Sequence, residues 1–307
     1  MKGSWRKLGA LFCPAGENRH PKLLTHAANP LPVQLKGDVY RVFFSGRDAR
    51  NRSSVGAVDI DLVARQVLYE HPEPLFEHGP EGSFYADGVS IGNCYETAAG
   101  HFMLFMGWRN PADAHWHGEI GRLRVHEDLG LSLDGTGGAF MPLDAEDPIS
   151  LSYPWVEGSA SSGFRMWYGS TVAWDAGNGE MSHLIRQASS QDGENWRKHG
   201  SAVPHRVGLA QAFSRPTVIQ DADGHHMWFS YRSGSGQSYR IGYAASADGL
   251  EWQLALEDAG IDVSTGGWDS EMIEYPFVLD HSGRRYMLYN GNGYGRTGFG
   301  LAVFEHA

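Results

Sequence analysis

The segment Glu271–Tyr294 reads EMIEYPFVLDHSGRRYMLYNGNGY, and the rest of the chain can be interpreted from it. Its polar beginning ends in a Tyr-Pro pair, and the apolar run Phe277-Val278-Leu279 follows. The residues Asp, Ser and Gly then separate this run from a second β-rich run, Arg285–Asn290. Such a pattern is typical of a hairpin, so we expect two antiparallel strands joined by a turn at Asp280–Gly283.

The same unit occurs five times in the 307 residues. In each copy, an opening position is followed by a β-rich run, a turn and a second β-rich run. The opening positions are 30, 88, 154, 216 and 276, which lie 58, 66, 62 and 60 residues apart. A regular period of this length predicts a repeat architecture with one supersecondary unit per copy. The other copies are Asn29–Gly46, Asp87–Gly107, Tyr153–Gly169 and Arg215–Tyr231.

Each copy continues with a polar, glycine-rich loop and a third β-rich run. Two copies then contain the sequence Ser-x-Asp-Gly-x-x-Trp, at Ser190–Trp196 and Ser246–Trp252, in which the Asp-Gly pair suits a tight structural turn. Four short strands per copy, without helical periodicity, predict an all-β fold: a five-bladed β-propeller with four-stranded antiparallel blades. The third runs are Val55–Ile60, Glu119–Val125, Met181–Ser189, Tyr239–Ala245 and Gly298–Phe304.

The fifth copy has only three strands of its own, because the chain stops soon after Phe304. The apolar stretch Trp5–Phe12 is available to supply the missing outer strand. We therefore expect the N-terminal strand to close the last blade. No linker separates the copies, so residues 1–307 are expected to form a single propeller domain.

The overall composition argues against several classes of protein. A net charge of −11 and a pI near 5.7 disfavour nucleic acid and anionic membranes as partners. No window reaches the roughly 18 to 20 apolar residues that span a bilayer, and no secretory signal follows the first residues. The two cysteines have no metal-ligand spacing, and His115-Trp116-His117 lacks a third ligand. These features predict a cytoplasmic protein without metal or cofactor, and they leave the oligomeric state open.

In a propeller, the start of each blade's first strand and the loop after its second strand open on one face. Residues at these places should therefore converge, although they lie about 60 positions apart. Aromatic side chains stack on sugar rings, and polar side chains bind hydroxyl groups, so this rim predicts a small-molecule carbohydrate site. The candidate substrate-binding residues are His26, Asn29, Arg47, Trp108, Arg109, Tyr153, Trp155, Arg215, Tyr231, Arg232, Asn290, Tyr294 and Arg296.

The five copies, the hairpin Tyr275–Asn290 and the two Ser-x-Asp-Gly-x-x-Trp turns resemble the five-bladed propeller glycosidases. This group includes glycoside hydrolase families 43, 62, 32 and 68, and the family 130 phosphorylases with their mannosyltransferase relatives. The resemblance covers the whole chain at the level of architecture, and no long motif selects one family. It implies catalytic carboxylates at the mouth of the central channel, contributed by the opening positions of different blades.

The carboxylates match this resemblance only in part. The families commonly have an acidic residue at or before the first opening proline, where this chain has Asn29. Glycosidic cleavage by a pair of carboxyl groups needs them about 5 to 9.5 Å apart. The opening positions supply Asp87 together with Glu274 or Glu271, and Asp48 in the first loop is a reserve.

Seven arginines fall on predicted upper-face segments of this acidic protein. A cluster of guanidinium groups suits phosphate or carboxylate, so we expect an anionic sugar, a sugar phosphate or a nucleotide sugar as substrate. The leading hypothesis is an enzyme that hydrolyses, phosphorolyses or transfers a glycosidic bond. Because of Asn29, a non-catalytic sugar-binding propeller is the alternative, and a protein-interaction propeller ranks last. The seven residues are Arg47, Arg50, Arg52, Arg109, Arg215, Arg232 and Arg296.

Overall fold

The computed structural model describes residues 3–16 and 18–306, and almost all of its regular structure is β-strand. The first strands of the copies are β2 (Thr25–Lys36), β6 (Gly88–Thr97), β10 (Ser150–Ser159), β14 (Gln211–Asp221) and β18 (Glu274–His281). The second strands are β3 (Val39–Arg47), β7 (Gly100–Arg109), β11 (Gly163–Ala173), β15 (Gly224–Arg232) and β19 (Arg284–Asn290). The hairpins expected from the sequence are confirmed, including the one at 271–294.

The third strands are β4 (Ser53–Asp61), β8 (His117–Val125), β12 (Ser182–Ser190), β16 (Arg240–Ser246) and β20 (Phe299–His306). The outer strands are β5 (Gln66–Glu70), β9 (Leu131–Leu133), β13 (Arg197–Ser201), β17 (Gln253–Leu254) and β1 (Gly3–Phe12). Two short helical turns, η1 (Leu256–Ala259) and α1 (Asn292–Gly295), complete the described elements. No helix in this part of the chain is long and apolar enough to cross a bilayer.

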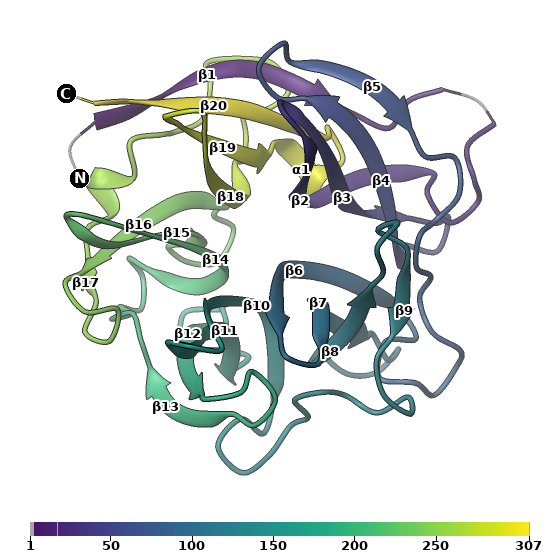
Figure 1. Cartoon of the computed structure of the whole chain (residues 1–307). Coiled ribbons are helices and arrows are strands. Elements are labelled where there is room, and N and C mark those ends of the chain that lie inside the picture. Colours follow the sequence, from purple (N-terminus) through teal and green to yellow (C-terminus); the bar gives the residue numbers. More distant parts are fainter. Residues whose placement is uncertain (1–2, 17, 307) are drawn as a thin grey trace.

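The strands form antiparallel sheets that surround a common centre (Figure 1). Three sheets have four strands each: β10 to β13, β14 to β17, and β18 to β20 with β1. The strands β2 to β9 are joined into one eight-stranded sheet by a single parallel pair, Ser53 with Gly88. Each first strand contacts the next along the chain, and β18 contacts β2, so the first strands close a ring.

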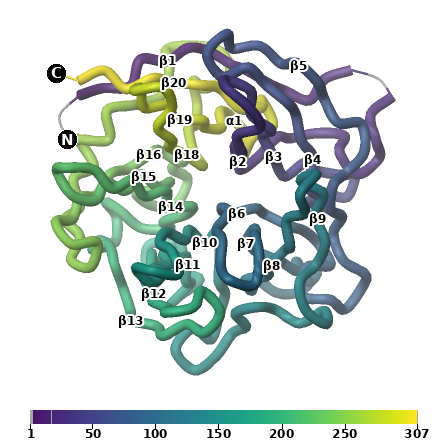
Figure 2. The backbone as a smooth tube through the Cα atoms, in the orientation of Figure 1, coloured from purple at the N-terminus to yellow at the C-terminus, as the bar shows by residue number. Residues whose placement is uncertain are grey.

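The two ends of the chain meet in one sheet, as the sequence predicted. Strand β1 pairs antiparallel with β20, and Trp5 lies opposite Phe304 (Figures 1 and 2). Trp5 is buried and makes edge contacts with Phe304 and with Trp228 of the neighbouring sheet. The N-terminal strand therefore joins the last sheet to its neighbour as well as completing it.

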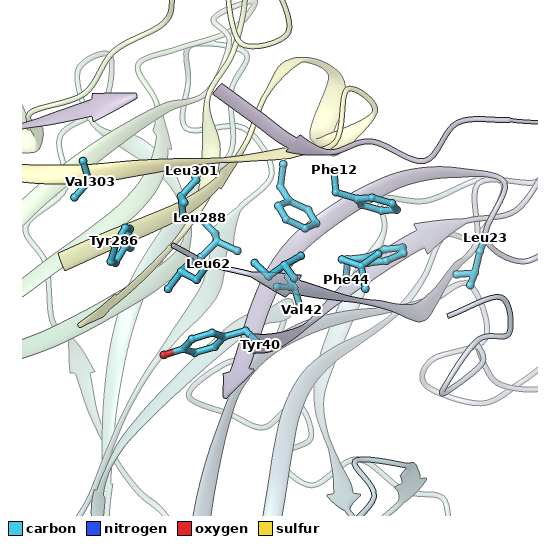
Figure 3. Packing of buried hydrophobic residues seen from close by; sticks show 14 residues of the cluster. Phe12, Leu23, Tyr40, Val42, Phe44, Leu62, Tyr286, Leu288, Leu301 and Val303 are labelled. Carbon is cyan, nitrogen blue, oxygen red and sulfur yellow. The ribbon is translucent and has the colours of Figure 1, made fainter. Parts of the chain in front are cut away.

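Apolar side chains fill the spaces between neighbouring sheets. In the cluster drawn in Figure 3, Phe12 and Phe44 pack against each other between the sheet of β2 to β5 and that of β18 to β20. The Ser-x-Asp-Gly-x-x-Trp turns have the structural role expected of them. Asp192 and Asp248 accept backbone N–H groups of their own turns, and Trp252 is buried against its neighbours.

Every first strand has a two-residue bulge, where the pairing with the second strand skips, and in β18 this bulge directly follows the first residue of the strand. In four strands the bulge is an X-Pro pair whose first residue has positive φ: Asn29, Tyr153, Arg215 and Tyr275. In β6 the skip falls at Gly92-Asn93. The opening position of the second copy is therefore 93, and position 88 was wrong. The corrected spacing is 60 to 63 residues throughout.

Arg215 connects the bulges at the centre of the ring. Its guanidinium donates to the carbonyl oxygens of Pro30 and Tyr275 at 2.9 Å each, and at longer range to those of Pro276 and Gly92. The side chain is buried, and this burial lowers the pKa of Arg215 to about 9. The expectation that Arg215 binds substrate was wrong, because its hydrogen bonds are directed to the backbone of β2, β6 and β18.

Replacing Arg215 should destabilise the protein more than replacing an exposed arginine. Arg215→Met leaves carbonyl oxygens of three first strands without donors, and each unpaired buried group costs about 1 to 3 kcal/mol. We expect the free energy of unfolding, measured by urea titration, to fall by about 3 kcal/mol or more. The matched control Arg197→Met, on the exposed edge strand β13, should change it by less than about 0.5 kcal/mol. A loss below about 1 kcal/mol for Arg215→Met would show that the ring does not depend on this contact.

Candidate functional site

A pocket of about 400 Å³ opens at the centre of the ring. It lies on the face where the first strands begin and where the loops that follow the second strands are found. Six of the residues proposed from the sequence line it: Asn29, Arg47, Trp108, Tyr153, Arg232 and Tyr294. Several other lining residues were not among the candidate substrate-binding residues, including Asn51, Asn110, Trp116, Ser152, His183, Tyr239 and Tyr275. No Asp or Glu lines this pocket in the described residues.

Two arginines give the pocket a positive character. The Arg47 side chain has neither a hydrogen bond nor an ion pair within residues 3–16 and 18–306. Arg232 donates to the Glu180 carboxylate at 2.8 Å, and its guanidinium lies 4.7 Å from the centre of the Tyr239 ring. An anionic group could therefore bind Arg47 without displacing any protein partner.

The carboxyl group of Glu274, at the start of β18, lies close to the pocket arginines and tyrosines without lining the pocket. It is completely buried, and neither of its oxygens has a partner at hydrogen-bond geometry. Burial raises the pKa of Glu274 well above its ordinary value, while the charges of Arg47 and Arg232 and the nearby Tyr275 phenol act against this rise. Because burial dominates, Glu274 keeps its proton to a higher pH than an exposed carboxyl group does.

Four pocket tyrosines surround Glu274. The pKa of each is raised, first by burial and further by the negative charge that Glu274 would carry if ionised. The Tyr153 hydroxyl donates to the Tyr275 hydroxyl at 3.3 Å. Both of these residues belong to the central bulges and have positive φ, which is strained for a bulky residue. The other two tyrosines are Tyr239 and Tyr294.

His183 forms a second polar group in the wall of the pocket. Its ring nitrogens lie 2.6 Å from the hydroxyl oxygens of Ser152 and Thr171. Burial lowers the pKa of His183 to about 3, so the ring is neutral at physiological pH. Gly169 makes room for this arrangement, because a Cβ there would lie 2.2 Å from the Ser152 hydroxyl oxygen.

The segment that contains two histidines at 115 and 117 contributes aromatic surface. The His115 ring stacks on Trp174 at 4.6 Å between ring centres, and Trp116 meets Trp174 edge-on at 5.1 Å. Trp116 and Trp108 both line the pocket and offer faces on which a sugar ring can stack. Among the described residues, no group of three or more His, Cys, Asp or Glu side chains is placed to hold a metal ion.

The other carboxylates proposed as catalytic lie outside the pocket lining. Asp87 is half-buried at the rim, where it accepts the backbone N–H of the lining residue Asn110 at 2.8 Å. Asp48 accepts two backbone N–H groups of its own turn and the Arg52 side chain. Glu271 is exposed. Of the four candidates, only Glu274 is electrostatically coupled to the pocket arginines.

Three further proposed binding residues have structural contacts. These correct the expectation for the buried Asn290 and Trp155, whereas a binding role for the half-buried Tyr231 stays a prediction. Asn290 is buried, accepts the Asn29 N–H and donates to the carbonyl oxygens of Ala27 and Gly298, so it joins β19 to β2. Trp155 packs on Phe277 in the core between sheets. Tyr231 packs against the same core cluster.

The remaining three candidates lie around the site without lining the pocket. His26 is largely buried, and burial, Arg47 and Arg296 lower its pKa to about 4. Arg296 is exposed, and a terminal nitrogen of Arg109 lies 3.9 Å from the Glu119 carboxylate. Binding roles for these residues stay predictions.

No family model matches the chain. Two proteins from strains of Mycobacterium tuberculosis, "Uncharacterized protein MT1551" and "Uncharacterized protein Rv1502", are 42% identical to it over 313 residues. The match spans 99% of this chain and 100% of each relative.

Several solved structures have the same fold at low sequence identity. A glycosyl hydrolase from Bacteroides ovatus has a TM-score of 0.71 at 11% identity and covers 99% of this chain and 94% of its own. A second structure has a TM-score of 0.72 at 11% identity, again covering 99% of this chain and 94% of its own. It is described as "The GH130 family of mannoside phosphorylases contains glycoside hydrolases that target beta-1,2 mannosidic linkages in Candida mannan". Sucrose-6-phosphate hydrolase from Lactobacillus gasseri has a TM-score of 0.61 at 11% identity, and the match covers 92% of this chain and 59% of that chain. The fold is therefore that of propeller glycosidases, as the sequence resemblance implied.

The burial of Glu274 should appear in the pH dependence of stability. A carboxyl group with a raised folded-state pKa favours folding fully below its unfolded pKa, near 4.5, and this contribution is lost as pH rises toward the folded value. The free energy of unfolding of Glu274→Gln should match wild type near pH 4. At higher pH, the free energy of unfolding of Glu274→Gln should exceed that of the wild type, and this difference should grow by up to about 1.4 kcal/mol per pH unit.

Urea titrations from pH 4 to 9 measure this difference. The exposed neighbour serves as a control: Glu271→Gln should show no such growth with pH. A constant difference between Glu274→Gln and wild type across the range would show that the carboxyl ionises normally in the folded protein.

Proposed function

The chain belongs to the family of the two mycobacterial proteins, and we propose that it is a carbohydrate-active enzyme that breaks or forms a glycosidic bond. In this proposal the whole chain is one five-bladed propeller domain, and the central pocket is the active site. The observation that carries the proposal is Glu274: a fully buried carboxyl group whose pKa is raised by burial, beside a pocket with two arginines and several aromatic rings.

Glu274 is proposed as the acid that protonates the leaving oxygen. A carboxyl group with a raised pKa keeps its proton to a higher pH, and the protonated form is the state that general-acid catalysis requires. Arg47 and Arg232 would hold an anionic group, such as phosphate or the phosphate of a sugar phosphate or nucleotide sugar. The faces of Trp108 and Trp116 would bind the sugar ring.

The lack of a carboxylate in the pocket lining favours phosphorolysis or glycosyl transfer over hydrolysis. Hydrolysis by the usual route needs a second carboxylate to activate water or to attack the sugar. A phosphate held by the two arginines is itself a nucleophile and needs no such base. Asp87, at the rim next to Asn110, stays the candidate for the second carboxylate if hydrolysis occurs.

The same lack of a lining carboxylate supports a second candidate function, a sugar-binding propeller without catalysis. This alternative keeps the roles of the arginines and aromatic rings and gives Glu274 no chemical role. It predicts binding of a sugar or sugar phosphate, measured by calorimetry, without turnover of any substrate.

Incubation with labelled sugar phosphates, nucleotide sugars, and aryl glycosides with inorganic phosphate separates the two functions. We expect turnover by the wild type, and a loss of about 10²- to 10⁴-fold in kcat in Glu274→Gln with an unactivated leaving group. Arg47→Ala should raise KM for the anionic reactant, whereas the control Arg197→Ala should not. No turnover across the panel, or full activity in both Asp87→Asn and Glu274→Gln, would exclude the enzymatic proposal.

A further inference from the structure

A second pocket, of about 370 Å³, lies at the opposite end of β10 from the central pocket. Tyr153, near the start of this strand, lines the central pocket, whereas Glu157 and Gly158, near its end, line the second one. The remaining walls come from β11, from β12 with the turn that follows it, and from β14 and β15 of the neighbouring sheet. The second pocket therefore lies between two sheets and is separate from the proposed active site.

The second Ser-x-Asp-Gly-x-x-Trp turn holds two side chains of this pocket in place. The Asp248 carbonyl oxygen accepts a hydrogen bond from the Arg165 guanidinium at 2.5 Å. Gly249 leaves room for Arg165 and His225, because a Cβ at this position would lie 2.3 Å from the guanidinium and 3.1 Å from the imidazole ring. Trp252 meets the His225 ring edge-on, with 6.4 Å between ring centres. The turn therefore helps to build the pocket besides connecting two strands.

Several polar groups of the second pocket lack partners. His225 is only 5% exposed, and its Nδ1 atom is buried without a hydrogen-bond partner in the protein. This atom lies 3.6 Å from the Glu157 carboxylate, which itself accepts no hydrogen bond within residues 3–16 and 18–306. The side-chain amides of Gln191 and Gln220 are also unpaired in the described part of the chain. Such a set of unpaired groups suits a ligand that can both accept and donate hydrogen bonds.

Glu157 replaces an apolar residue of the repeat. Four positions after the first residue of the bulge, β2, β14 and β18 have Val33, Ile219 and Leu279, which pack against the clusters between sheets. Strand β6 has Glu96 at this position, but that side chain is exposed. In β10 the glutamate is half-buried, and burial raises the pKa of Glu157. A half-buried carboxyl group where other copies have aliphatic side chains is a candidate for ligand binding.

We propose that this second pocket is a binding site for a neutral sugar. The site goes beyond the proposed function and does not depend on catalysis at the central pocket. Sugar hydroxyl groups both donate and accept, so one hydroxyl can donate to Glu157 while a neighbouring one accepts from Arg165. The amides of Gln191 and Gln220 can pair with further hydroxyl groups of the same ligand.

The charges around the second pocket favour a neutral ligand over an ion. The charge of Arg165 is opposed by that of Glu157 when the carboxyl group is ionised, and burial lowers the pKa of His225, which favours its neutral ring. The central pocket differs, because the Arg47 side chain there has no partner in the described residues and suits an anion. Phe164 lines the second pocket but is only 2% exposed, so it offers no open face for stacking. We therefore expect binding in the millimolar range.

Amide NMR of ¹⁵N-labelled protein tests this site directly. Titration with D-glucose, D-mannose and D-galactose to about 100 mM should shift the signals of Gly158, Gly163 and Gln191, and at least one sugar should reach saturation. Glu157→Leu, which restores the aliphatic side chain of other copies, should weaken this binding by about tenfold or more. The matched control Glu96→Leu, at the equivalent exposed position of β6, should leave it unchanged.

Two further arms check the class of ligand and the place where it binds. Inorganic phosphate and ammonium chloride, as an anion and a cation, should not saturate the same amide signals. Trp116→Ala removes an aromatic face of the central pocket and should leave the sugar-dependent shifts at the second pocket unchanged. If Trp116→Ala abolished these shifts, they would report binding at the central pocket, and the second site would be excluded.

Three other results would overturn the second site. None of the three sugars might give saturable shifts in the wild type, Glu157→Leu might bind as tightly as the wild type, or phosphate or ammonium might bind there more tightly than every sugar. Should Glu157→Leu not fold, Arg165→Met decides in its place, because it removes the guanidinium donor and should weaken binding in the same way. Turnover of glycosides is not part of this measurement, so failure of the proposed function would leave its outcome intact.

Discussion

The hydrogen bonds of the buried Arg215 guanidinium are the contact on which the centre of the molecule depends. Each first strand has a bulge, and the carbonyl oxygens released from the ladders of β2, β6 and β18 need donors. Arg215 supplies them from β14 with a single planar group. A buried cation without a carboxylate partner is costly, and its depressed pKa reflects that cost. The fold keeps it because one side chain satisfies the backbone of three other strands.

The same bulges that create this arrangement also build the pocket. A positive φ at Asn29, Tyr153, Arg215 and Tyr275 gives these four residues a common backbone conformation at the centre of the ring. Arg215 connects the strands, whereas Asn29, Tyr153 and Tyr275 line the pocket. Structural and functional roles are therefore divided among equivalent positions of the repeat. The close packing of the inner strands extends to Gly92, where a Cβ would lie 2.3 Å from the Pro154 carbonyl oxygen.

Glu274 shows how the site opposes stability. Burial raises the pKa of the carboxyl group, which suits an acid catalyst but makes its ionisation unfavourable to folding. The fold offers no hydrogen bond to either oxygen, whereas the amide of Asn290, the residue paired with Glu274 across the ladder, is used by the backbone of β2. An unpartnered buried carboxyl group in an otherwise well-paired centre is what a functional residue, rather than a structural one, would look like.

The sequence by itself determined the hairpins, the repeat, the closing N-terminal strand and the aromatic and arginine-rich character of the pocket. These features follow from local alternation, turn residues and spacing, which are properties of neighbouring residues in the chain. It could not distinguish Arg47 from Arg215, since both are arginines at predicted upper-face positions, and it misplaced the opening of β6, whose bulge has no proline. Only the tertiary structure decided that Arg215 binds backbone, that Asn290 and Trp155 are structural, and that Tyr239 and His183 reach the pocket. The physical reason is that burial and hydrogen bonding at the centre depend on side chains from strands about 60 residues apart. How deep each of these side chains lies below the pocket is set by the packing of the whole ring.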